Sequence, residues 1–115
     1  MAYSEKLASR IREALTHQPN VEEKKLMTGL TFMVNGKMCV CAVENKLMCR
    51  IDPAIQDEAL EKKGCSAMVM KGKPLKGYVF IEEEGISNKK DFDYWINLSL
   101  DFNDRAKASR KRKKK

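Results

Sequence analysis

Apolar and polar residues alternate through the middle of the chain at the spacing that is typical of β-strands. Within Leu26–Arg50, two apolar runs flank Asn35-Gly36, a dipeptide that readily adopts the positive φ angles of a type I′ turn. A further strand, Leu47–Ile51, follows the short polar segment Glu44–Lys46. The pattern therefore predicts an antiparallel meander at the centre of the fold.

Helical spacing of apolar residues is found in three other segments. They are Ser4–His17, Ala54–Lys63 and a last helix from Lys89 to about Lys107. A residue suited to N-capping stands at or just before the start of each segment: Ser4, Asp52, and Ser87 or Asn88. In the last segment the apolar face consists of Phe92, Trp95, Ile96 and Leu100, widened by Leu98 and Phe102. We expect these faces to pack on the sheet.

The remaining apolar segments predict three more strands, Val21–Met27, Ser66–Met70 and Tyr78–Glu82, the first of them at a sheet edge. Residues 71–77, KGKPLKG, are predicted to form a loop. The fold class is then α+β: a two-layer domain with a largely antiparallel sheet and three helices, in the order α-β-β-β-β-α-β-β-α.

Strand alternation also predicts which residues face away from the helices. They are Thr31, Met33, Cys39, Cys41 and Val43. This set is apolar for a solvent-facing surface, which makes it a candidate surface for a partner or a homodimer. The alternative is that one helix covers this face.

Positive charge is concentrated at the C-terminal end. The net charge is +7, yet the last eleven residues hold eight Lys or Arg and no acid, which leaves 15 basic against 16 acidic residues in 1–104. We therefore expect a domain at 1–104 and a disordered basic tail at 105–115. The cations of the tail are Arg105, Lys107, Arg110, Lys111, Arg112, Lys113, Lys114 and Lys115. They indicate sequence-independent contact with DNA or RNA, the alternative being a solubilising terminus.

The chain shows no apolar run long enough for a membrane span or a signal peptide, so we expect a cytoplasmic protein and no membrane contact. Its four cysteines are then expected to be reduced. Cys39 and Cys41 are predicted to share one strand face, and Cys49 to lie across from Cys41 if the loop between the two strands has three residues. A metal or redox module built on these three thiols is the alternative.

Residue types that support catalysis do not converge in the sequence. His17, the single histidine, has no identifiable nucleophile beside it. We therefore expect no enzymatic activity and no cofactor. Arg50, Lys73 and Lys76 are candidate contacts for an anion or a partner, and the alternative function is a small-molecule-binding protein or minor enzyme with a pocket near Arg50, Lys76 and Tyr78.

Five segments together resemble the N-terminal domain of the TfoX/Sxy competence regulators, in the form of a short stand-alone member. They are the helix YSEKLASRIREAL, the run LTFMVNGKMCV at Leu30–Val40, LMCR at Leu47–Arg50, GKPLKGYVF at Gly72–Phe80, and a helix bearing Trp95. The chain departs from the family at Leu26–Gly29, where Thr28 replaces a glycine and makes a positive φ less favourable.

The resemblance implies an α+β fold without established chemistry of its own, similar to that of secretion chaperones, which bind other proteins. It also implies a link to regulation, because full-length members act with a cyclic-AMP-responsive activator on the genes of DNA uptake. We therefore expect a regulatory or adaptor domain with a protein partner, whose tail adds nucleic-acid contact.

Overall fold

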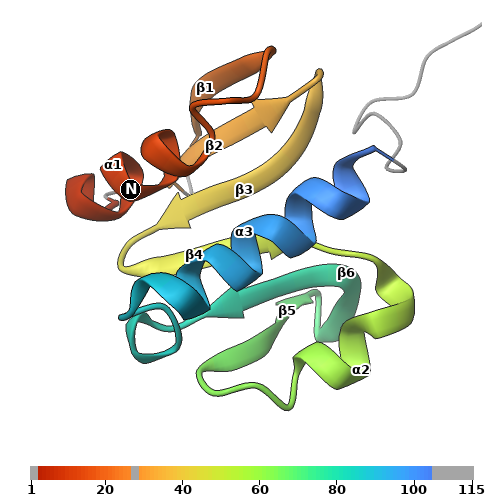
Figure 1. Cartoon of the computed structure of the whole chain (residues 1–115). Coiled ribbons are helices and arrows are strands. Elements are labelled where there is room, and N and C mark those ends of the chain that lie inside the picture. The colour runs from red at the N-terminus through yellow and green to blue at the C-terminus, as the bar shows by residue number, and fades with distance from the viewer. Residues whose placement is uncertain (1–2, 27–28, 105–115) are drawn as a thin grey trace, which may run out of the picture.

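A computed structural model describes residues 3–26 and 29–104 of the chain. Its described part contains one antiparallel sheet with strand order β1-β2-β3-β4-β6-β5 (Figure 1). The strands are β1 Val21–Leu26, β2 Gly29–Val34, β3 Lys37–Val43, β4 Lys46–Arg50, β5 Cys65–Met70 and β6 Lys73–Ile81. The helices are α1 Glu5–Ala14, α2 Gln56–Ala59 and α3 Lys89–Asn103, with short 3₁₀ turns at Pro53–Ile55 and Glu83–Gly85. The predicted α+β class and element order are confirmed.

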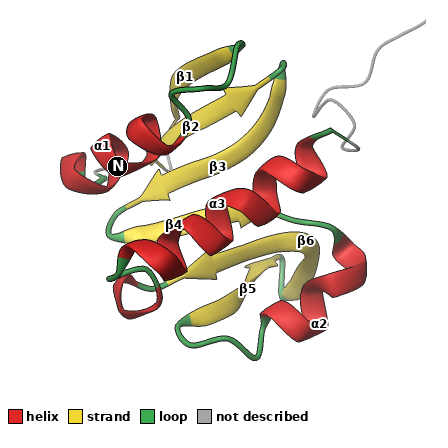
Figure 2. Ribbon diagram, viewed as in Figure 1, coloured by secondary structure: helices red, strands yellow, loops and turns green. Residues whose placement is uncertain are grey.

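The two long helices, α1 and α3, lie on the same face of the sheet (Figure 2). The core fills the space between them and the strands, with Ile11, Phe32, Val40 and Trp95 among its fully or almost fully buried members. None of the helices among residues 3–26 and 29–104 has the length and apolar character that crossing a bilayer requires.

The α1 helix begins as predicted and ends earlier. The Ser4 hydroxyl accepts a hydrogen bond from the Leu7 amide at 3.1 Å, which confirms the N-cap. The hydroxyl of Thr16 donates to the carbonyl of Glu13 at 2.8 Å, and such local bonding competes with continued helix. The predicted end at His17 is therefore wrong, and His17 is an exposed residue after the helix.

Two backbone features organise the meander. Asn35 and Gly36 have φ angles of 56° and 78°, so the predicted type I′ turn is confirmed. At the start of β2, Gly29 has φ 152°, and a β-carbon there would overlap the carbonyl of Ala42 on β3. The departure from the family at Thr28 lies outside the described residues.

Strand register assigns each face. One row crosses the whole sheet through Lys25, Leu30, Ala42, Leu47, Ile81 and Cys65, and it faces the helices. The neighbouring row faces away from them through Lys24, Thr31, Cys41, Met48, Phe80 and Ser66. Thr31, Cys41 and Met48 are nonetheless buried among their neighbours. The predicted apolar outer face is thus present, and its use by a partner or a second copy stays a prediction.

The prediction for Cys39 is wrong because of a bulge. Phe32 pairs with Val40 and Met33 pairs with Met38, which leaves Cys39 as an extra residue on β3. Cys39 packs in the core cluster instead of sharing a face with Cys41. Regular alternation of side chains along a strand would place Cys39 and Cys41 on the same face. The inserted residue breaks this alternation, so the two side chains lie on opposite faces.

The β5–β6 hairpin is longer than predicted. Lys71 and Gly72 have φ angles of 54° and 79° and form the turn, and Lys73–Gly77 is part of β6 rather than a loop. The predicted helix Ala54–Lys63 is correspondingly shorter, since the α-helical part covers only Gln56–Ala59. The buried Gln56 side chain accepts a hydrogen bond from the Gly77 amide and so ties α2 to β6.

The α3 helix begins where Asn88 caps it. The Asn88 Oδ1 accepts from the Asp91 amide at 2.8 Å. The helix ends at Asn103, before the predicted end near Lys107, which lies outside the described residues. The predicted division into a domain at 1–104 and a tail at 105–115 has its boundary at the last described residue, and the tail itself stays a prediction.

Candidate functional site

The tail residues that the sequence singled out are outside the described part of the chain. They are Arg105, Lys107, Arg110, Lys111, Arg112, Lys113, Lys114 and Lys115. Their contact with nucleic acid stays a prediction that only an experiment on the full chain can test.

Arg50 and Tyr78 are brought together, as neighbours across β4 and β6. The guanidinium carbon of Arg50 lies 5.8 Å from the centre of the Tyr78 ring and 5.9 Å from that of Phe102. Its Nη1 is buried without a hydrogen-bond partner. The guanidinium thus lies near two aromatic rings, a favourable environment for a cation.

Lys73 and Lys76 lie on β6, the strand that also carries Tyr78. Both lysines are exposed on β6, and Lys73 pairs with Met70 at the turn end of the hairpin. Neither lysine, nor Arg50 or Tyr78, is among the lining residues of two cavities at the start of α3, and a pocket near Arg50, Lys76 and Tyr78 stays a prediction. The anion or partner contact at these residues stays a prediction.

The cysteines are free and mostly buried. Cys39, Cys41 and Cys49 are buried and Cys65 is half-buried, and all four are free thiols. Burial raises the pKa of Cys39 to about 12 and that of Cys65 to about 11, and it also raises the pKa values of Cys41 and Cys49. Raised values keep the thiols in the unreactive protonated form.

The predicted neighbours of Cys41 need one correction. Cys41 pairs with Met48, and Cys49 pairs with Val40, so Cys49 faces the core rather than Cys41. Among the described residues, no three His, Cys, Asp or Glu side chains lie close enough to hold a metal ion.

Of the cavities at the first turn of α3, two are lined mainly by basic residues among their charged groups. The first, of about 420 Å³, opens between the N-terminal turns of α1 and α3. Its cations are Lys6, Arg10 and Lys89, and its acid is Glu83. Lys89 lies 2.7 Å from the carboxylate of Asp93, a hydrogen bond that raises the pKa of Lys89, and Arg10 lies 4.2 Å from the centre of the Phe92 ring. These contacts engage two of its three cations within the protein.

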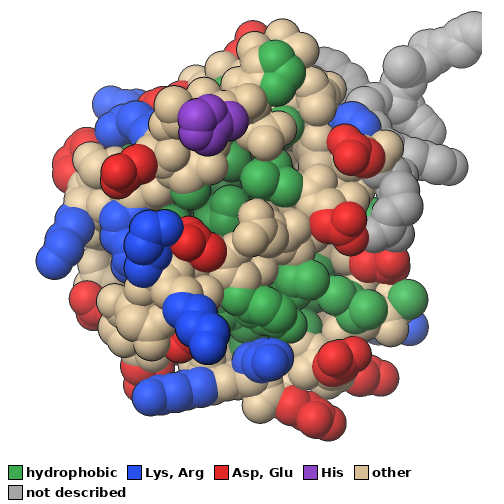
Figure 3. All heavy atoms as spheres, in the orientation of Figure 1, with side chains coloured by type: hydrophobic (Ala, Val, Ile, Leu, Met, Phe, Trp, Pro, Cys, Tyr) green, Lys and Arg blue, Asp and Glu red, His purple; other side chains and the backbone are tan. Residues whose placement is uncertain are grey.

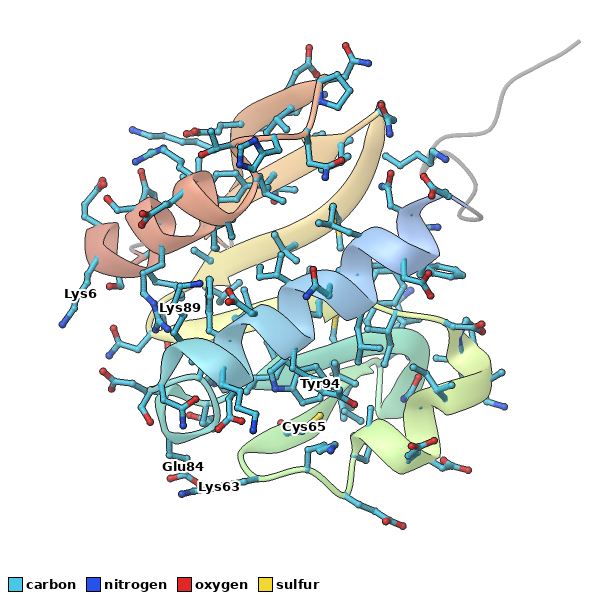
Figure 4. All side chains as sticks on the ribbon, in the orientation of Figure 1. Lys6, Lys63, Cys65, Glu84, Lys89 and Tyr94 are labelled. Atoms are coloured by element: carbon cyan, nitrogen blue, oxygen red, sulfur yellow. The ribbon has the colours of Figure 1, made fainter. Side chains whose placement is uncertain are left out.

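The second cavity, of about 300 Å³, lies on the other side of the same helical turn, and we call it the Tyr94 cavity. It is lined by Lys62, Lys63, Gly85, Lys90, Asp91, Tyr94 and Trp95. In Figure 4, Tyr94 projects from α3 on the side where Lys63 and Glu84 lie. Figure 3 shows basic side chains bordering the hydrophobic surface on this face of the molecule.

Close packing of two loops positions the lysines of the Tyr94 cavity. A β-carbon on Gly64 would lie 3.1 Å from the amide nitrogen of Gly85, and one on Gly85 would overlap the carbonyl of Lys63. The Glu82 amide also donates to the Gly64 carbonyl at 2.8 Å. The turn after α2 is therefore held against the segment that begins α3, which places Lys62 and Lys63 beside Lys90.

Charge in the Tyr94 cavity is predominantly positive. Its lining includes three lysines and one acid, Asp91. The carboxylate of Asp91 accepts a hydrogen bond from the Asn88 side chain at 3.1 Å, so it takes part in the helix cap. Ammonium groups beside an aromatic ring can bind an anion attached to a planar group.

Sequence reasoning did not find the residues of the Tyr94 cavity. One signal was available, because Tyr94 is an aromatic residue beside, and not within, the apolar stripe of α3. The pairs Lys62-Lys63 and Lys89-Lys90 are separated by a hairpin in the sequence. The packing of Gly64 on Gly85 brings Lys62 and Lys63 beside Lys90.

The fold and this surface define a small α+β domain with one antiparallel sheet and a lysine-lined cavity at the start of its last helix. The chain belongs to the TfoX N-terminal domain family, whose model matches residues 13–103. The match confirms the resemblance found in the sequence, and it includes the Tyr94 cavity. Searches of curated proteins and of solved structures gave no significant match.

Proposed function

We propose that this chain is a non-enzymatic regulatory or adaptor domain that contacts DNA or RNA non-specifically through residues 105–115. The charge distribution carries the proposal. Eight cations and no acid occupy the last eleven residues, and residues 1–104 have a net charge of −1. A dense run of Lys and Arg releases condensed counterions when it binds phosphates, and this release drives binding to any nucleic-acid sequence.

Family membership supports the regulatory part of the proposal. Because the family is that of the TfoX N-terminal domain, the finer proposal is a role in the regulation of competence genes in the cytoplasm. Attraction to DNA would raise the local concentration of such a domain at promoters.

The outer sheet face is the surface that we propose for a protein partner. Met33 and Val43 are half-buried there, and Thr31, Cys41 and Met48 lie between them. The face is apolar, and the two long helices pack on the opposite side of the sheet (Figure 1). An apolar sheet face of this kind is a common type of protein-binding surface.

The tail proposal is tested by changing its eight Lys and Arg residues to Gln in the full chain. Binding to a 20-base-pair duplex of random sequence is measured at low salt by fluorescence anisotropy. The affinity of the variant should be at least tenfold lower. A control with the tail residues in scrambled order should bind like the parent, because the contact depends on charge alone. Equal binding by the Gln variant would show that the tail does not hold nucleic acid.

A further inference from the structure

Tyr94 is unusual among the large apolar side chains of the described residues. It and Val69 are the two that are exposed, Tyr94 to 37%. Its neighbour Trp95 is 2% exposed, and the two rings meet edge to face with centres 5.1 Å apart. Trp95 thus fixes the Tyr94 ring from the core side, and part of the ring remains open to the Tyr94 cavity.

Lysines lie in the cavity to which this ring is open. The ammonium group of Lys62 lies 4.8 Å from the ring centre, and Lys63 and Lys90 line the same cavity. A cation over an exposed ring is held only weakly, and this one belongs to a flexible side chain. A ligand that stacks more strongly on this face of the Tyr94 ring can therefore displace Lys62.

We propose that the Tyr94 cavity binds an unpaired base of a single-stranded nucleic acid. The base stacks on Tyr94 in place of Lys62, and Lys62, Lys63 and Lys90 contact the phosphates on either side. The site is part of the folded domain and is separate from the tail. It shares with the proposed function only the class of ligand, nucleic acid.

The geometry favours a single strand over a duplex. In a duplex the faces of the bases are covered by their neighbours, whereas an unpaired base presents a face on which an aromatic side chain can stack. Lysines beside an exposed aromatic residue are the combination that single-strand-binding surfaces use. The tail has no aromatic residue and gives no such preference.

Intrinsic fluorescence reports on this cavity directly. Trp95 is the single tryptophan of the chain and lines the cavity. A base bound beside it should therefore quench its emission. Titration of the full chain with a twelve-residue oligothymidylate should quench Trp95 emission, and a duplex of equal length should quench it much less.

Substitution of Tyr94 tests the proposal. Tyr94→Ala should weaken oligothymidylate binding about fivefold to a hundredfold and leave duplex binding unchanged, and Tyr94→Phe should bind like the parent. Circular dichroism and urea unfolding verify that both variants are folded. Unchanged single-strand binding by Tyr94→Ala, or an equal loss for both ligands, would overturn the proposal. Failure of the tail proposal is recognised separately, from the duplex binding of the Gln variant.

A charge-matched pair of variants tests the lysines. Lys63→Gln with Lys90→Gln should weaken single-strand binding more than Lys24→Gln with Lys25→Gln, which removes the same charge from exposed positions on β1. Glu84→Gln, at the rim beside Lys63, should strengthen it (Figure 4). Equal effects of the two lysine pairs would contradict the site. Quenching of Trp95 by polyglutamate as strong as that by oligothymidylate would assign the cavity to an acidic protein segment instead.

Discussion

The side-chain amide of Asn103 donates a hydrogen bond to the backbone carbonyl of Val34 at 3.1 Å, joining the last turn of α3 to the end of β2. Asn103 is 3% exposed, and its own backbone carbonyl accepts from the Lys37 ammonium at 2.7 Å. Asn103 thus donates one hydrogen bond to the β2–β3 hairpin and accepts another from it. Such contacts fix the position at which α3 crosses the sheet.

We predict that Asn103→Ala lowers the free energy of unfolding by about 1–3 kcal/mol, because the buried Val34 carbonyl loses its side-chain partner. The control is Asn97→Ala, at an exposed position of the same helix. It should be neutral or stabilising by up to about 0.7 kcal/mol, since alanine is the better helix former. Urea unfolding measures both, and equal stabilities would show that the Asn103 contact contributes nothing.

Two glycines in the meander should respond differently to the same substitution. Gly29→Ala places a β-carbon against the Ala42 carbonyl, and the strand pairing fixes both backbones. Gly36 also has a positive φ, but a β-carbon there meets nothing within 4 Å. We expect Gly36→Ala to cost about 1–2 kcal/mol from backbone conformation alone and Gly29→Ala to cost distinctly more. Thermal and urea unfolding measure the loss of stability in each variant, and equal losses would show that the overlap with the Ala42 carbonyl has no effect.

Stability should fall as the pH rises above the pKa of an ordinary thiol. Burial raises the pKa of Cys39 to about 12, so the native thiol stays neutral where the unfolded one, with a pKa of about 8.5, ionises. The unfolded state then binds fewer protons than the native state, and the free energy of unfolding decreases with pH. The expected decrease is at most about 1.4 kcal/mol per pH unit for each such thiol, between roughly pH 9 and 12.

Comparison of variants separates this effect from lysine and tyrosine titration. Cys39→Ala with Cys49→Ala should reduce the slope of unfolding free energy against pH between 8.5 and 10.5. Cys65→Ala, which removes one thiol whose pKa is raised to about 11, should reduce the slope by somewhat less than half as much as the double variant. Identical slopes for the parent and the double variant would refute the assignment.

Local signals in the sequence were sufficient for most elements of the fold. The Asn35-Gly36 turn and the Ser4 cap depend on the residues that form them, and both are confirmed. The bulge at Cys39 and the early start of β6 depend on pairing partners elsewhere in the chain. Alternation within a single strand carries no information about an inserted residue, so these two features could not be predicted.

The candidate site was harder to predict than the fold. Lysines at a surface are common, and neither Lys62-Lys63 nor Lys89-Lys90 indicates a site by itself. Their significance depends on the contact between Gly64 and Gly85, which joins segments about twenty residues apart. The tail was evident in the sequence because its charge is contiguous and requires no folding to be recognised.

The most direct test of nucleic-acid contact through the tail is the salt dependence of duplex binding by the full chain. A plot of the logarithm of the association constant against the logarithm of salt concentration has a slope of about −0.9 for each phosphate neutralised. The account predicts a steep slope for the parent, up to about −7 if all eight tail cations bind phosphates, and a slope near zero for the variant with Gln at those eight positions. A slope that is the same in both proteins would contradict it.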